Sequence, residues 1–167
     1  MHLDNSKIIM SQQIYTGYAG SQALLFYYKA VGLHPIIISG GRIRGYSHCK
    51  DSKYIKNLAP MIKWWWPWHQ SVTSYNIRIA QKWYVKYYTT QILNKLDPQI
   101  VYDEFVKFGN GLPVIICCEG EQQESLFCHR HLIAKWLESN IPGLVISEFP
   151  HANQYFLLSE CGQTNHR

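Results

Sequence analysis

Two short apolar runs constrain the fold of this chain more than any other feature. They read HPIIIS at residues 34–39 and PVIICC at residues 113–118, and neither alternates apolar with polar positions. Strands with apolar side chains on both faces are typical of parallel sheets that helices cover on both sides. The runs QIYTGY at 13–18 and GLVISEF at 143–149 predict two further strands. The sequence therefore predicts a mainly parallel sheet.

Helical patterns separate these strands. Helices are predicted over residues 21–32, 76–96, 99–109 and 128–139. Ser21 is suited to begin the first helix and Gly32 to end it, while Asp97 and Pro98 separate the second from the third. Alternating strands and helices predict an α/β fold, with one Rossmann-like domain whose mainly parallel sheet is flanked by helices. This domain is expected over residues 13–149, after a leader at 1–12 and before a C-terminal tail at 150–167 that packs on it.

Charge and cysteine content indicate which kinds of partner and which cellular compartment to expect for this chain. The formal net charge of +5 and pI of about 8.9 are compatible with a phosphate-bearing partner such as a nucleotide or nucleic acid. No apolar run approaches the length that spans a bilayer, so we expect no membrane partner. The odd count of five cysteines and the lack of a targeting signal at the N-terminus predict a reducing, cytoplasmic setting with free thiols.

The segment FCHRHLIAKWLE places four side chains that could act in binding or catalysis next to one another, at residues 128–131. Rotation by about 100° per residue places His129 on the apolar face of the predicted helix, Arg130 on its flank and His131 nearly opposite, in solvent. Cys128 is expected at the helix N-terminus, where free N–H groups and the helix dipole favour an anion. Because ligands collect beyond the carboxyl ends of parallel strands, we expect the loop at residues 16–21, after the first strand, to lie beside the loop at residues 119–127 that leads into this helix.

Three interpretations of this segment compete. A zinc site would use Cys118, Cys128 and a histidine, but the spacing is unlike the common Cys-x-x-Cys arrangements, so we expect no metal and no cofactor. A nucleophilic site would use Cys128 as a thiolate stabilised by Arg130, with Glu119 or His129 as the acid or base. In the third interpretation, His129 is a buried core residue and Cys128 a small residue at a helix start.

Four motifs together resemble a known family. The chain contains YTGY near its start, WYVKYY to ILNKLDP, VIICCEGE followed by FCHRHLIAKWLE, and ISEF. Across residues 13–149 this pattern is similar to the bacterial and phage family called domain of unknown function 488, whose fold is Rossmann-like. The resemblance implies a site built from Tyr18, Arg42, Glu119, Cys128, His129 and Arg130. Many family members have an acidic residue two positions before the arginine of the second strand, where this chain has Gly40.

Aromatic and basic side chains outside this segment offer further contacts. WWWPWHQ at residues 64–70, which includes Trp66, is suited to stack on bases, to cover the sheet as a lid or to form a homodimer contact. Pro67 is expected to prevent a continuous helix there. A basic stripe on the following predicted helix is either a solvated face or a phosphate track; it consists of Arg78, Lys82 and Lys86. Arg42 and Arg44 follow a glycine pair at a strand end, where the backbone and a guanidinium group can both approach an anion.

These patterns favour binding of a phosphate-bearing nucleotide or a nucleic-acid segment at the helix mouth formed by Cys128, His129 and Arg130. A reaction on a nucleobase or its glycosidic bond would suit the carboxylate and aromatic groups near this mouth. The alternatives are a non-catalytic binder of a small nucleotide signal and a protein-interaction module. Whether the chain is an enzyme stays open at this point.

Overall fold

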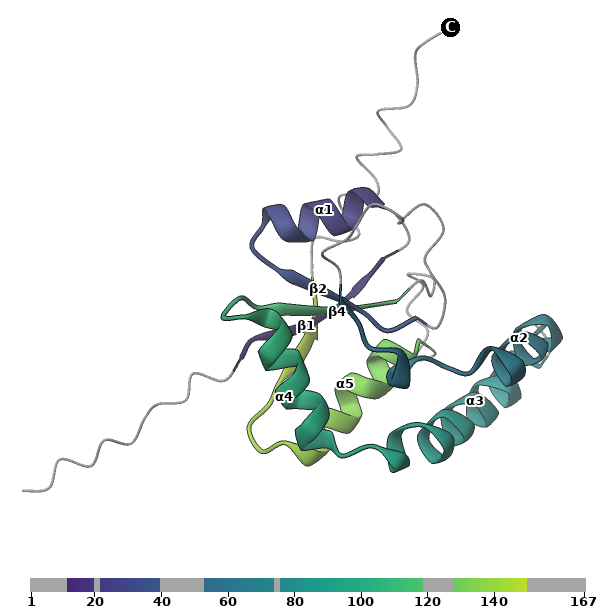
Figure 1. The fold of residues 1–167 in the computed structure, drawn as a ribbon. Helices are drawn as coiled ribbons and strands as arrows, with labels where there is room; N and C mark the ends of the chain where they lie inside the picture. Colours follow the sequence, from purple (N-terminus) through teal and green to yellow (C-terminus); the bar gives the residue numbers. More distant parts are fainter. Residues whose placement is uncertain (1–11, 20–21, 40–52, 74–75, 119–127, 150–167) are drawn as a thin grey trace, which may run out of the picture.

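A five-stranded parallel sheet forms the centre of the domain (Figure 1). The computed structural model describes residues 12–19, 22–39, 53–73, 76–118 and 128–149. The strand order is β3-β2-β4-β1-β5, and every neighbouring pair is parallel. The strands are β1 (Ile14–Tyr18), β2 (His34–Ile37), β3 (Lys53–Tyr54), β4 (Val114–Cys118) and β5 (Ile146–Glu148). This arrangement confirms the predicted α/β, Rossmann-like fold.

Strand β4 is central, and all five of its residues are buried. Val114, Ile116 and Cys118 face one hydrophobic cluster, while Ile115 and Cys117 face another on the opposite side of the sheet. Both faces of this strand are therefore apolar, which accounts for the absence of alternation in its sequence.

Helices cover both faces of the sheet. The helices are α1 (Gln22–Ala30), α2 (Ile62–Ser71), α3 (Ile77–Gln91), α4 (Pro98–Gly109) and α5 (His129–Asn140), with short 3-10 turns η1 (Lys56–Leu58) and η2 (Leu93–Lys95). Figure 1 shows α1 on one face and α4 and α5 on the other, while α2 and the beginning of α3 project from the body of the domain. We refer to α2 and α3 together as the helical arm.

The two hydrophobic clusters differ in size. The larger includes Tyr84 and Tyr88 of α3, Phe105 of α4 and residues of α5, all packed on the α5 face of the sheet. The smaller contains Leu24, Leu25 and Tyr28 of α1. Since Tyr84 and Tyr88 are buried, the second half of α3 anchors the arm to the domain.

Two helix boundaries lie at residues that were predicted to end a helix or to separate two helices. Gly32 has a φ of 82° just after α1, a backbone conformation that favours glycine. The Asp97 carboxylate accepts hydrogen bonds from the backbone N–H groups of Gln99 (2.8 Å) and Ile100 (3.2 Å) at the start of α4. Ser21, the predicted cap of α1, lies outside the described residues.

We expected Pro67 to prevent a continuous helix, and this expectation is wrong, because α2 continues through it. A proline inside a helix removes one backbone hydrogen bond. Contacts with α3 offset this loss: the Trp68 indole N–H donates to the Ala80 carbonyl (3.2 Å), and its ring packs on Tyr84 at a centroid distance of 4.8 Å. The short strand β3 was also not predicted. The leader and the tail lie outside the described residues.

The Asp97 cap gives a test of the fold. We expect Asp97→Ala to lower the free energy of unfolding by about 1 kcal/mol, because two N–H groups at the start of α4 lose their acceptor. Urea denaturation followed by circular dichroism measures this change. Asp103→Ala, which removes an exposed carboxylate within the same helix, is the control and should have a smaller effect.

Candidate functional site

The carboxyl ends of β1 and β4 meet the N-terminus of α5. Tyr18 and Cys118, the last residues of these strands, are register partners, and Cys128 is the N-cap of α5. The chain continues from β1 to α1 on one face of the sheet and from β4 to α5 on the other (Figure 1). Ligands of parallel α/β domains commonly bind beyond the carboxyl ends of such strands.

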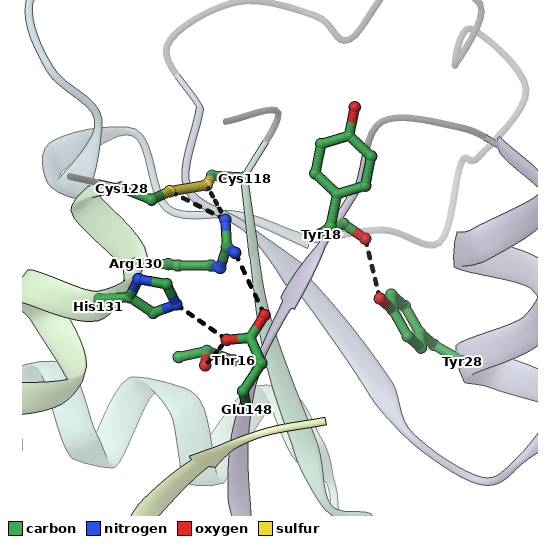
Figure 2. Close-up of polar contacts among 8 residues, drawn as sticks. All are labelled: Thr16, Tyr18, Tyr28, Cys118, Cys128, Arg130, His131 and Glu148. Carbon is green, nitrogen blue, oxygen red and sulfur yellow. Dashed lines mark hydrogen bonds and ion pairs between the residues drawn. A yellow bond between two sulfur atoms is a disulfide. The ribbon is translucent and has the colours of Figure 1, made fainter. Parts of the chain in front are cut away.

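Cys118 and Cys128 bring their sulfur atoms into contact at this edge, where they are joined as a disulfide (Figure 2). Their Cα atoms are 7.8 Å apart, beyond the usual range of about 4.4–6.8 Å for disulfide-bonded cysteines. We expected free thiols, and among the described residues this holds for Cys117 alone. Burial raises the pKa of the Cys117 thiol far above its usual range, so it stays protonated.

Arg130 connects these sulfur atoms to a carboxylate. Its side chain is 2% exposed. Its Nη1 donates to the sulfur of Cys118 (3.3 Å) and of Cys128 (3.1 Å), and its Nη2 pairs with Glu148 Oε1 at 3.2 Å (Figure 2). Since a buried charge requires an opposite charge or strong hydrogen bonds, Glu148 is an oppositely charged partner that stabilises the buried guanidinium.

Glu148 collects three donors at the end of β5. Thr16 is its register partner on β1, and the Thr16 hydroxyl donates to the carboxylate, as does Nε2 of His131 at 3.0 Å. Burial alone raises the pKa of Glu148, but the hydrogen bond from His131, the charge of Arg130 and the hydrogen bond from Thr16 lower it to about 2. Glu148 is therefore ionised at neutral pH.

His129 lies on the buried side of α5, as predicted. Its Nε2 is 3.1 Å from the carbonyl oxygen of Ile38, and its ring packs against Tyr88 at a centroid distance of 5.8 Å. Because a carbonyl only accepts, Nε2 carries the proton and Nδ1 keeps a lone pair. Burial lowers the pKa of His129 to about 4, so the ring is neutral at pH 7.

A ligand set for a metal is present at the same place. Cys118, Cys128 and His129 each offer one ligand atom, and these atoms lie within 4.8 Å of one another. The sequence spacing gave little indication of this group, because Cys118 ends a strand and the other two residues begin a helix.

The structure gathers some of the predicted site residues and separates others. Cys128, His129 and Arg130 share the edge with Tyr18, whose ring points away from the Arg130 network in Figure 2. Trp66 is on the projecting helix α2 and is 50% exposed. Glu119, Arg42 and Arg44 lie outside the described residues.

Sequence reasoning missed part of this network. We expected His131 to lie in solvent, but it is partly buried and bonded to Glu148. Glu148 and Thr16 were not predicted as site residues. The position of Glu148 at the end of a predicted strand was the available signal, because strand ends meet at one edge of a parallel sheet.

Comparisons of the chain with protein-family models, curated proteins and solved structures found no match. None of the helices in the described part is long and apolar enough to cross a membrane.

The Glu148 network gives a pH-dependent prediction. The folded-state pKa of about 2 lies below the usual value of 4.5, so Glu148 stabilises the fold above about pH 4.5, and this contribution is lost as the pH falls towards 2. We expect the difference in unfolding free energy between wild type and Glu148→Gln to shrink over this range. Urea titrations at several pH values measure it, and a difference independent of pH would contradict the ion pair. Glu138→Gln is the control. It removes a carboxylate whose hydrogen bond comes from one backbone N–H.

Proposed function

We propose that this chain binds a nucleic-acid segment or a phosphate-bearing nucleotide, and that the helical arm is the main binding surface. The observation that carries the proposal is the combination of exposed aromatic rings and exposed cations on α2 and α3. The resemblance to the domain of unknown function 488 family, which stays a prediction, implies a site at the neighbouring sheet edge.

Charge is strongly segregated along the chain. No Asp or Glu occurs between Asp51 and Asp97. The same interval contains Lys53, Lys56, Lys63, Arg78, Lys82, Lys86 and Lys95. Since the whole chain has a formal charge of only +5, the remainder is slightly acidic. The four cations of the arm are Lys63, Arg78, Lys82 and Lys86, and all are exposed. Such a basic surface attracts phosphate groups over several ångströms.

Aromatic rings accompany these cations. Trp66 stacks on His69 with an interplanar angle of 10°, and Trp83 stacks on Tyr87 with an angle of 22°. Trp66 is 50% and Trp83 is 42% exposed, so each ring pair borders solvent. Exposed indoles stack on bases of any sequence, and nearby cations supply the contacts to the backbone. The arm therefore has the two components that single-stranded nucleic-acid binding requires.

The sheet edge does not offer the exposed phosphate contact that the sequence suggested. Arg130 was, with Arg42, an expected phosphate contact, but its guanidinium is buried and paired with Glu148. The cations of the arm replace it as phosphate partners in this proposal. A reaction on a nucleobase would need an acid or base, and Glu148, the carboxylate of the described network, is engaged by Arg130, Thr16 and His131. The proposal therefore concerns binding, and it assigns no step of a reaction to Glu148.

A protein contact, including a homodimer, is the second candidate. It is favoured by exposed apolar side chains on and near the arm: Met61, Trp66, Ile77, Ile79 and Trp83. A surface of this kind often marks a protein interface. A dimer in light scattering that dissociates with Ile79→Lys, without nucleic-acid binding, would favour this candidate.

The basic stripe gives the first test of binding. In fluorescence anisotropy with labelled single-stranded oligonucleotides, we expect affinity to fall as salt rises. The triple variant Arg78→Ala, Lys82→Ala, Lys86→Ala should reduce the salt slope by about 2, because each lost phosphate contact removes about 0.7. The control triple variant Lys29→Ala, Lys107→Ala, Lys135→Ala changes the net charge equally, on α1, α4 and α5. Equal losses in the two triple variants, or no binding at low salt, would overturn the proposal.

The exposed indole gives the second test. We expect Trp66→Ala to weaken oligonucleotide binding by about 1–3 kcal/mol, the usual contribution of one base stacked on an aromatic ring. Phe26→Ala is the matched control, since Phe26 is a similarly exposed aromatic residue on α1. An unchanged affinity for Trp66→Ala with intact helicity would remove Trp66 from the binding surface.

A further inference from the structure

We propose that the reduced protein binds a divalent metal ion, with zinc as the best-suited ion, through Cys118, Cys128 and His129. The site lies at the carboxyl edge of the sheet and uses one ligand from the end of β4 and two from the start of α5. It does not depend on nucleic-acid binding by the arm.

The distances between the ligand atoms suit one ion. All three lie within 4.8 Å of one another. Two sulfur atoms on a tetrahedral zinc are roughly 3.8 Å apart, given a Zn–S distance of about 2.3 Å. The Cα separation of 7.8 Å between Cys118 and Cys128 is wide for a direct disulfide but leaves room for an ion between the thiolates. The two sulfur atoms would need to move apart by a small distance, after reduction of the disulfide, to bind the ion.

His129 is already oriented as a metal ligand. Its Nε2–H donates to the carbonyl oxygen of Ile38 at 3.1 Å, which leaves the lone pair of Nδ1 for an ion. Metal-binding histidines nearly always donate their second ring N–H to a carboxylate, carbonyl or water. The contact with the Tyr88 ring further limits rotation of the imidazole.

The surrounding charges also favour a divalent cation. Arg130 donates hydrogen bonds to both sulfur atoms, as groups that neighbour metal ligands commonly do, but its positive charge is also paired with Glu148. Two thiolates, Glu148 and Arg130 together have an excess of two negative charges. A divalent ion neutralises this excess among the described groups, of which Arg130 and both cysteines are buried and Glu148 is partly exposed, and Arg130 alone does not.

Thiolate and imidazole ligands select zinc over magnesium or calcium, which prefer oxygen. The described residues supply three ligands, the number used by catalytic zinc sites, in which water or a substrate atom takes the fourth position. Cys128 is 8% and His129 9% exposed, so the site lies close to the surface. Disulfide formation and metal binding exclude each other, because both use the same sulfur atoms.

Cobalt substitution tests the site directly. The full-length protein is reduced, freed of metal under anaerobic conditions and titrated with Co²⁺. We expect one equivalent to produce thiolate-to-cobalt charge-transfer absorption, and one equivalent of Zn²⁺ to remove it. Cys118→Ser and Cys128→Ser should each abolish this spectrum, and His129→Gln should weaken binding by about tenfold or more. Cys117→Ser is the matched control, because Cys117 neighbours Cys118 on β4 but faces the other side of the sheet.

The possible results of these experiments either support or overturn the proposed metal site. X-ray absorption spectroscopy of the zinc-loaded wild type should show two sulfur ligands and one imidazole nitrogen, which tests the site even where a variant fails to fold. A reduced wild type that binds neither ion stoichiometrically would overturn the proposal, as would equal metal loss in Cys117→Ser and Cys118→Ser with both variants folded. Oligonucleotide binding, measured on the same zinc-loaded and metal-free samples, reports separately on the proposed function.

Discussion

The buried guanidinium of Arg130 is the interaction on which the sheet edge depends. A charge that is 2% exposed is costly unless partners surround it, and these come from different elements: sulfur atoms from β4 and the start of α5, and the Glu148 carboxylate from β5. Thr16 of β1 adds a hydrogen bond to Glu148. Because these contacts come from β1, β4, β5 and α5, the positions of three strands and one helix are linked through this side chain.

The local pattern of α5 predicted part of this network and missed the rest for a physical reason. Helical periodicity identified the buried side of His129 and the position of Cys128 at the helix start, since both depend only on the geometry of one helix. The partners of Arg130 and His131 depend on the register between β1 and β5, which places Glu148 opposite Thr16. Strand pairing is a long-range property, so the sequence of α5 alone did not indicate that His131 would meet a carboxylate.

The same distinction applies to the fold. Continuous apolar runs predicted β2 and β4 well, because burial on both faces leaves a strong local signal. Strand β3 contains only two residues, so it leaves almost no signal in the local sequence. Pro67 was misleading because its local preference is outweighed by tertiary contacts of the next residue, Trp68, with α3. Sequence spacing likewise gave little weight to a metal site, since its ligands come together only when β4 and α5 pack.

A continuous series of aromatic contacts joins the helical arm to the sheet edge. Trp68 packs on Tyr84, whose ring is stacked on Tyr88 at 5.8 Å, and Tyr88 contacts His129 at the same centroid distance. The Tyr88 hydroxyl also donates to the carbonyl of Leu58. The packing that holds the imidazole of His129 against Ile38 therefore also anchors the base of the arm. A surface suited to nucleic acid and a group suited to a metal ion thus rest on one shared set of buried rings, although each is built from different side chains.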